Sequence, residues 1–281
     1  MYKTTVLLVL NKETDNPYLE EFALAAKDYD MRVSCFLLDE NAAMPPSIYG
    51  ATMYGTIDMS EAWQQSMAAT SAALKKRSEE IKAVLAQTGC SADIQSVLCS
   101  TTEASEHVAR CARVCDLAVL APNLRETPDL FNAAAFGILY KTPIALMVNT
   151  VPTRPVKRAL VAWDGSNAAS SAVHNALNFL QSAEEVRVVC FDPITSQREA
   201  GAEPGADLAV WLSHHGCTVQ VSQEPSGGKE ISTCIEERAK EFGTDLIIMG
   251  AYGHSRLVQA VLGGTTRTLL AQNEFPVLMS H

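Results

Sequence analysis

Short apolar runs alternate with longer amphipathic segments along the whole chain. A compact apolar run bounded by polar residues or glycine is typical of a buried strand, whereas apolar residues three and four positions apart indicate a helix. The strands predicted in this way cover residues 5–10, 33–39, 94–98, 116–120, 142–148, 158–163, 186–192, 219–221, 245–249 and 275–279. Helical spacing is found in residues 18–29, 168–180 and 231–242.

The last five predicted strands repeat the first five in the same order. Residues 5–10 correspond to 158–163, for example, and 116–120 correspond to 245–249. Agreement of this extent predicts an internal repeat. The strand–helix alternation predicts a parallel sheet with helices on both faces and right-handed crossovers. We therefore predict two tandem α/β domains, each with a five-stranded parallel sheet, that cover residues 1–150 and 156–281 and are joined by a proline-containing linker.

The first half carries additional residues between its second and third strands. They include the segments 44–50 and 53–55, which contain methionine and tyrosine, and a long helix predicted from about residue 58 to 85. Methionine adapts to irregular surfaces. This insertion is interpreted either as a ligand or partner surface, or as a segment that packs within its own domain or against the sister domain.

Charge and cysteine content narrow the function classes. The net charge of -10 argues against a nucleic-acid backbone as the main partner, although a local loop can still attract a nucleotide. The start of the chain predicts a strand rather than a secretory leader, and no apolar run is long enough to span a bilayer. The eight cysteines lack regular spacing, which predicts reduced, buried thiols in a cytoplasmic protein. Cys111 and Cys115 lie four residues apart, which leaves a metal pair as the alternative.

A glycine loop provides the strongest chemical signal. Gly250-Ala-Tyr-Gly253 follows a predicted strand, and nine residues later Gly263-Gly264-Thr265-Thr266 precedes residues with helical spacing. Glycines allow the backbone to approach an anion, and a helix N-terminus offers unpaired N–H groups and a positive dipole end. The arrangement of strand, glycine loop and helix therefore predicts a phosphate-binding site.

The second half, from Val156 to His281, resembles the universal stress protein family. The resemblance rests on the stretch Leu160-Val-Ala-Trp-Asp164-Gly-Ser166, on the spacing of the glycine loop, and on the closing strand Phe275-Pro-Val-Leu. The first half resembles a degenerate copy of the same domain. Together the similarity covers nearly the whole chain, in the tandem form of the family.

The resemblance implies a Rossmann-like, adenine nucleotide alpha hydrolase-like fold that binds ATP or AMP, with or without Mg²⁺, at the carboxyl ends of its strands. It implies that Asp164 contacts the adenosine, that Ala162 and Val189 line the adenine slot, and that Met249 and Gly250 flank the sugar and adenine. The residues implied to hold the phosphates are Gly253, Gly263, Gly264, Thr265 and Thr266. Because the family commonly forms dimers, we expect either a homodimer or an intramolecular pseudo-dimer.

The sequence departs from the family pattern at Gly264, where ATP-binding relatives carry serine or threonine. The departure removes one hydroxyl donor, although Thr265 is a possible substitute. A hydrogen bond to a charged oxygen contributes roughly 1.5–3 kcal/mol, which corresponds to about one to two decades in affinity. Weaker ATP binding, or a preference for AMP or another adenosine ligand, is therefore expected.

The first half is predicted to have lost the site. Asn11 stands at the position of Asp164, and the loop after Leu120 contains Pro122 and lacks glycine before Gly137. Proline has no N–H group to offer a phosphate. We expect this half to stabilise the other as a structural partner.

Several isolated residues allow both a functional and a structural interpretation. His254 either touches phosphate or water or is exposed loop, and Arg267 either reaches a phosphate or forms a surface ion pair. His214 and His215 are predicted to end a helix, where a positive charge is favourable. Ser226-Gly-Gly-Lys229 lacks the first glycine of a phosphate loop and is interpreted as a helix cap followed by a solvated lysine.

No catalytic set is recognisable in the sequence, because Asp164-Gly-Ser166 lacks the frame of a hydrolase nucleophile elbow. We predict a stress-response binding protein whose nucleotide-dependent state is recognised by other proteins. The alternatives are a nucleotide-free interaction protein, a weak ATPase or nucleotide-dependent transferase, and a redox sensor that uses its cysteines.

Overall fold

The computed structural model describes residues 4–41, 57–90, 92–151, 156–193, 203–251 and 264–281. The elements of the first half are β1 (Thr4–Leu10), α1 (Asn16–Asp28), β2 (Met31–Glu40), α3 (Ile57–Gln87), β3 (Ala92–Cys99), α4 (Thr101–Ala112), β4 (Leu117–Leu120), the short 3₁₀ helix η1 (Pro122–Glu126), α5 (Pro128–Lys141) and β5 (Ala145–Val148). Those of the second half are β6 (Arg158–Ala162), α6 (Asn167–Asn175), α7 (Leu177–Ser182), β7 (Glu185–Phe191), α8 (Ala206–His214), β8 (Val219–Glu224), α9 (Ile231–Phe242), β9 (Leu246–Gly250), α10 (Gly264–Ala271) and β10 (Val277–Ser280).

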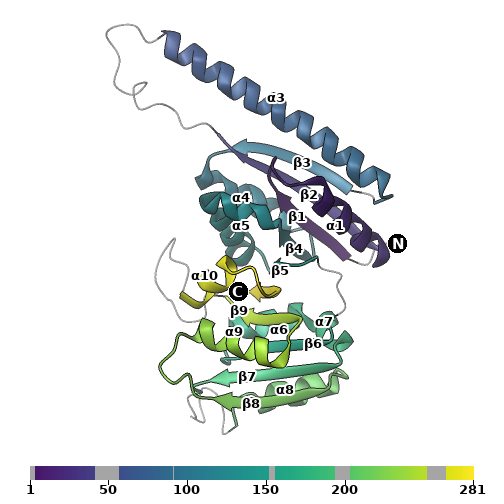
Figure 1. Cartoon of the computed structure of the whole chain (residues 1–281), viewed down its shortest axis with the longest axis vertical. Helices are drawn as coiled ribbons and strands as arrows, with labels where there is room; N and C mark the ends of the chain where they lie inside the picture. The colour runs from purple at the N-terminus through teal and green to yellow at the C-terminus, as the bar shows by residue number, and fades with distance from the viewer. Residues whose placement is uncertain (1–3, 42–56, 91, 152–155, 194–202, 252–263) are drawn as a thin grey trace.

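The strands form one sheet in the order β3-β2-β1-β4-β5-β10-β9-β6-β7-β8 (Figure 1). Within each half all neighbouring strands are parallel, and the two halves have the same strand order, which confirms the predicted tandem α/β fold. The halves meet through the antiparallel pair β5–β10, in which Met147 lies opposite Leu278. The two five-stranded sheets are therefore joined into a single ten-stranded sheet.

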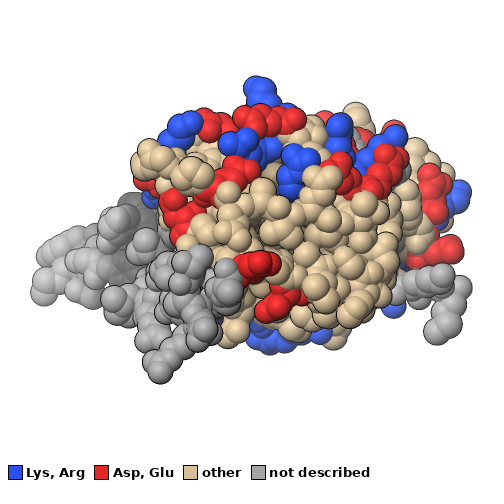
Figure 2. All heavy atoms as spheres, turned by 90° about the horizontal axis from the view of Figure 1, so that it is seen from below, with Lys and Arg blue, Asp and Glu red and all other residues tan. Residues whose placement is uncertain are grey.

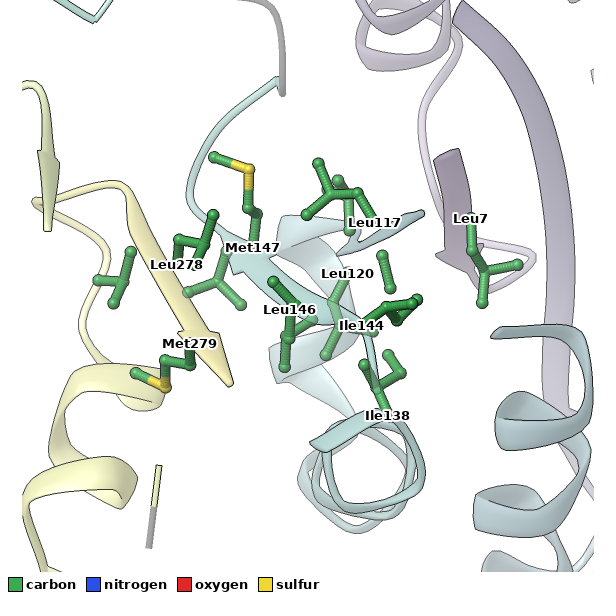
Figure 3. Close-up of a cluster of buried hydrophobic side chains, with 14 of the residues drawn as sticks. Leu7, Leu117, Leu120, Ile138, Ile144, Leu146, Met147, Leu278 and Met279 are labelled. Atoms are coloured by element: carbon green, nitrogen blue, oxygen red, sulfur yellow. The ribbon is translucent and has the colours of Figure 1, made fainter. Parts of the chain in front are cut away.

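The main hydrophobic core runs continuously through this junction. Every residue of β4, β5 and β10 is buried, as a strand covered by helices on both faces requires. Figure 3 shows Leu146 and Met147 of β5 beside Leu278 and Met279 of β10, with Ile138 of α5 on the β5 side of this cluster. Both halves contribute residues to this one core.

The repeat extends to individual hydrogen bonds. At the amino end of β1, the Thr5 N–H group donates to Asp116 Oδ2 at 2.7 Å. At the matching end of β6, the Arg158 N–H group donates to Asp245 Oδ2 at 2.8 Å. Both aspartates directly precede the fourth strand of their half, which supports the correspondence predicted between 116–120 and 245–249.

Side chains of the first half also hydrogen-bond to the second. Asn149, which follows β5, donates from Nδ2 to the carbonyl oxygens of Gln272 and Phe275 at 2.9 and 2.8 Å. Arg125 Nε donates to Leu270 O at 3.0 Å, near the C-terminal end of α10, where a cation is favourable. These contacts fix the orientation of the two halves.

Three local predictions need correction. The helix predicted over 168–180 is divided at Ala176 into α6 and α7. Val151, the first residue after the predicted first domain and so part of the predicted linker, is buried together with Thr150. Ser226 does not cap α9, because Glu230 holds the N-cap position and Ser226 Oγ instead accepts from the Gly228 N–H group at 3.2 Å.

The insertion in the first half contains the predicted long helix, now α3. Its C-terminal part buries Leu74, Ile81 and Leu85. The methionine- and tyrosine-containing segments 44–50 and 53–55 lie outside the described residues, so both interpretations of them stay open. Within the part of the chain that the structure describes, no helix combines the length and apolar character needed to cross a membrane.

Candidate functional site

Three neighbouring strands of the second half end side by side. Ala162 of β6 pairs in register with Val189 of β7 on one side and with Met249 of β9 on the other. Residues paired in this way point to the same face of a sheet. Val189 and Met249 are buried and Ala162 is half-buried, so the carboxyl end of the sheet is apolar here and Ala162 is the most accessible of the three.

The turn after β6 places a carboxylate beside this end of the sheet. Asp164 is exposed, and its Oδ1 accepts from the Ser166 N–H group at 2.9 Å. Gly165 between them has a φ of 75°, which glycine adopts without strain. Ser166 Oγ accepts from the Ala169 N–H group at 3.1 Å, so Ser166 is the N-cap of α6.

Gly250 is required by helix packing. A Cβ atom at this position would lie 2.4 Å from Ala169 N and 2.7 Å from the carbonyl carbon of Ala168. The end of β9 and the first turn of α6 approach each other so closely that only glycine fits. Sequence reasoning assigned Gly250 to the ligand; the structure gives it a packing role that the sequence alone did not reveal.

The residue after Gly250 is tied to β10 and to the first half. The Ala251 N–H group donates to Ser280 O at 2.7 Å, and Ala251 O lies 2.9 Å from His281 Nδ1. The His281 ring in turn packs on Tyr140 of α5, with 4.4 Å between ring centroids. The start of the glycine loop is therefore anchored on both halves.

The far end of the glycine loop leads into α10, which begins at Gly264 as predicted. Gly264 is exposed, and a Cβ atom built on it would meet nothing within 4 Å. Thr265 is half-buried, whereas Thr266 is only 3% exposed, so of these two threonines Thr265 is the more accessible. Gly253, Gly263 and His254 lie outside the described residues.

The equivalent edge of the first half is filled by its own side chains. Asn11 is only 5% exposed, and its Oδ1 accepts from the Glu13 N–H group at 3.0 Å and from Asn123 Nδ2 at 2.6 Å. Thr14 Oγ1 donates to Asn123 Oδ1 at 2.9 Å, and η1 begins at Pro122 directly after this edge. Arg77 of α3 covers the same loop by donating from Nη2 to Thr14 O at 2.5 Å. The sequence did not reveal that Asn123 and Arg77 take part in this cluster.

The eight cysteines are all buried and free. Burial raises the pKa of Cys35 to about 12 and that of Cys115 to about 11, which keeps both thiols protonated near neutral pH. Cys115 Sγ donates to Cys111 O at 3.4 Å, and Cys111 Sγ donates to Gln95 Oε1 at 3.5 Å. Across the described residues, no group of three or more histidine, cysteine or acidic side chains is placed to hold a metal ion.

Comparisons with known proteins agree with this architecture. Residues 155–281 match the model of the universal stress protein family. The universal stress protein Slr1230 of Synechocystis is 26% identical over 146 residues, which is 50% of this chain and 48% of that protein. The chain thus spans about half the length of this curated relative.

Two solved structures from Pseudomonas aeruginosa match nearly the whole chain. A candidate universal stress protein of strain UCBPP-PA14 has a TM-score of 0.54 at 16% identity, and the match covers 98% of this chain and 92% of that one. A protein of unknown function from strain PAO1 has a TM-score of 0.53 at 15% identity, with 98% and 91% covered. At such identities these structures support the fold alone.

The fold is a mostly parallel α/β fold, built as a tandem repeat. The second half of the chain is therefore similar to the universal stress protein family.

Proposed function

We propose that the second half binds one adenine nucleotide, ATP or AMP, at the carboxyl ends of β6, β7 and β9, and that the protein acts as a regulatory binding protein in a stress response. In this proposal residues 156–281 form the binding domain, and residues 1–150 form a structural partner that has lost its own site. The first half then takes the place of a second subunit in an intramolecular pseudo-dimer.

The contrast between the two sheet edges carries the proposal. In the first half, Asn11 and Asn123 hydrogen-bond to each other and fill the edge. In the second half, Asp164 is exposed two residues after the half-buried Ala162, which is paired with the buried Val189 and Met249. An apolar surface with a few polar groups at its rim is what a nucleoside requires.

The residues of the second half fit the parts of the nucleotide. The apolar end of these strands would receive the adenine ring, and the Asp164 carboxylate would accept hydrogen bonds from the ribose hydroxyls. The N-terminus of α10 would present backbone N–H groups to the phosphates. The open space around Gly264 lets a phosphate approach this backbone. Mg²⁺ usually binds nucleotides through phosphate oxygens and water with one or two carboxylates, so a dedicated metal cage is not needed.

The test is titration calorimetry with ATP, ADP and AMP on the wild type and on two substitutions at Asp164. We expect one nucleotide per chain and a loss of about 10- to 100-fold in affinity in Asp164→Ala, from the range for a hydrogen bond to a charged group. Asp164→Asn retains an acceptor for the Ser166 N–H group, so the turn is kept. A loss of affinity in this variant therefore reports a lost contact with the nucleotide. The matched control is Asp129→Ala, an exposed aspartate of the first half.

Equal affinity in the wild type and both Asp164 variants would contradict the site. The absence of any adenine compound from the purified protein, together with the absence of binding, would favour the nucleotide-free interaction protein. Steady turnover of ATP that is lost in Asp164→Ala would favour the weak ATPase.

A further inference from the structure

The residue that follows β10 lies where the two halves meet, at the point marked C in Figure 1. This residue, His281, has its Nδ1 atom 2.9 Å from Ala251 O, and its ring lies 4.4 Å from the ring of Tyr140 in α5. A carbonyl oxygen only accepts hydrogen bonds, so Nδ1 carries the proton in both the neutral and the charged ring. The His281 ring therefore connects a side chain of the first half to the backbone at the end of β9.

Tyr140 is itself held in place within the first half. The ring of Phe136, one turn earlier in α5, lies 4.7 Å from the Tyr140 ring. Lys141 Nζ lies 5.6 Å from the centroid of the Phe136 ring and donates to Ser105 Oγ of α4 at 3.0 Å. The ring that His281 contacts is therefore fixed by the packing of α4 and α5, and it offers His281 a defined surface.

Helix α6 is attached to the same region at both of its ends. Near its C-terminal end, Asn175 Nδ2 donates to Ser280 Oγ at 3.0 Å and to Pro143 O of the first half at 3.2 Å. At its first turn, α6 packs on Gly250 so closely that a Cβ atom there would lie 2.4 Å from Ala169 N. The position of α6 thus depends on the ends of β9 and β10 and on the first half.

We propose that Tyr140 of the first half, acting through His281, is a positioning residue for the nucleotide site. His281 holds Ala251, which follows Gly250, and Gly250 fixes the first turn of α6. Helix α6 begins directly after the turn that carries Asp164. Loss of the ring contact lowers the fraction of molecules in the binding arrangement, and the apparent affinity falls by that fraction. This inference rests on the proposed function, and it gives the first half a part in ligand binding.

The contacts that connect α5 to α6 involve no acidic, lysine or arginine side chain. Charged pairs of the second half lie elsewhere, as in α9, where Lys229 pairs with Glu237 at 2.7 Å. Figure 2, which views the molecule from the β8 end, shows positive and negative side chains together along the upper rim and only scattered ones below it. Coupling through packing does not depend on ionic strength, whereas coupling through surface charge is screened by salt. Salt therefore distinguishes the two routes.

The test is titration calorimetry of the full chain with ATP and with AMP. Tyr140→Ala and His281→Ala are each expected to weaken binding by roughly two- to tenfold, the range for a lost ring pair. The double variant should bind within about twofold of His281→Ala, because Tyr140 acts through His281. Tyr140→Phe keeps the ring and should restore the wild-type affinity. The control is Tyr29→Ala, the same substitution at a tyrosine that is 50% exposed at the end of α1.

If the wild type binds and the Tyr140→Ala and His281→Ala variants bind equally well, this inference is wrong and the proposed function stands. Additive losses in the double variant, or a loss that shrinks as salt is added, would also overturn it. A wild type that binds neither nucleotide contradicts the proposed function and this inference together. Circular dichroism shows whether each variant is folded; since Tyr140 and His281 are both exposed, we expect the wild-type spectrum.

Discussion

The substitution Gly264→Ser is expected to increase the affinity for ATP. A Cβ atom at this position meets nothing within 4 Å, and the residue begins α10, so a serine fits without displacing a neighbour. In the proposed site, its hydroxyl would add one donor to the phosphate that the N-terminus of α10 is proposed to bind. Serine also has a higher helix propensity than glycine, by roughly 0.5 kcal/mol, so the fold should not be weakened.

The magnitude follows from the exposure of the site. A hydrogen bond to a charged oxygen is worth roughly 1.5–3 kcal/mol. Gly264 is exposed to solvent, so water competes for the same phosphate oxygen and the lower end of this range applies. We therefore expect about a tenfold decrease in the dissociation constant for ATP.

The assay is titration calorimetry on the wild type, Gly264→Ser and Gly264→Ala. Alanine adds the same Cβ atom and a comparable change in backbone flexibility but no hydroxyl, so the difference between serine and alanine isolates the hydrogen bond. If the serine and alanine variants bind ATP with the same affinity, the hydroxyl does not reach a phosphate, and the assignment of the α10 N-terminus is wrong.

Two further predictions concern packing and thiol chemistry. Gly250→Ala should lower the free energy of unfolding by about 1–3 kcal/mol, because its Cβ atom would lie 2.4 Å from Ala169 N. Urea denaturation measures this change. The control is Gly264→Ala, which should lower the free energy of unfolding far less. In thiol labelling at pH 8, the folded protein should react much more slowly than the unfolded chain, since all eight cysteines are buried and the pKa of Cys35 is raised to about 12. The rate should increase with pH, because a raised pKa keeps the thiol protonated until the pH approaches it. A thiol that labels in the folded state as fast as in urea would instead support the redox sensor.

The sequence predicted the order and type of the strands because buried parallel strands leave compact apolar runs. Leu246–Gly250 and Val277–Ser280 lie within one or two residues of their predicted positions. The pairing of β5 with β10 could not be predicted, because an apolar run indicates a buried strand but not which other strand it pairs with. The division at Ala176 was also missed, because α6 and α7 continue the same apolar spacing.

The candidate site could be predicted only in part. Asp164 was identified through the resemblance of the stretch from Leu160 to Ser166 to the family, and the structure places its carboxylate in the turn that leads into α6. The structural role of Gly250 depends on how closely α6 approaches β9, which is a tertiary distance that no local pattern encodes. In the same way, the loss of the site in the first half was inferred from Asn11, but its filling by Asn123 depends on a contact between residues 112 positions apart.

The central antiparallel pair has a consequence for evolution. Separate subunits that meet through their last strands can exchange partners, so every copy must retain a working ligand pocket. Here β5 and β10 belong to one polypeptide, and the covalent connection holds them at a high effective concentration. The pairing is therefore permanent, so a change at the sheet edge of one half leaves it bound to the same partner half.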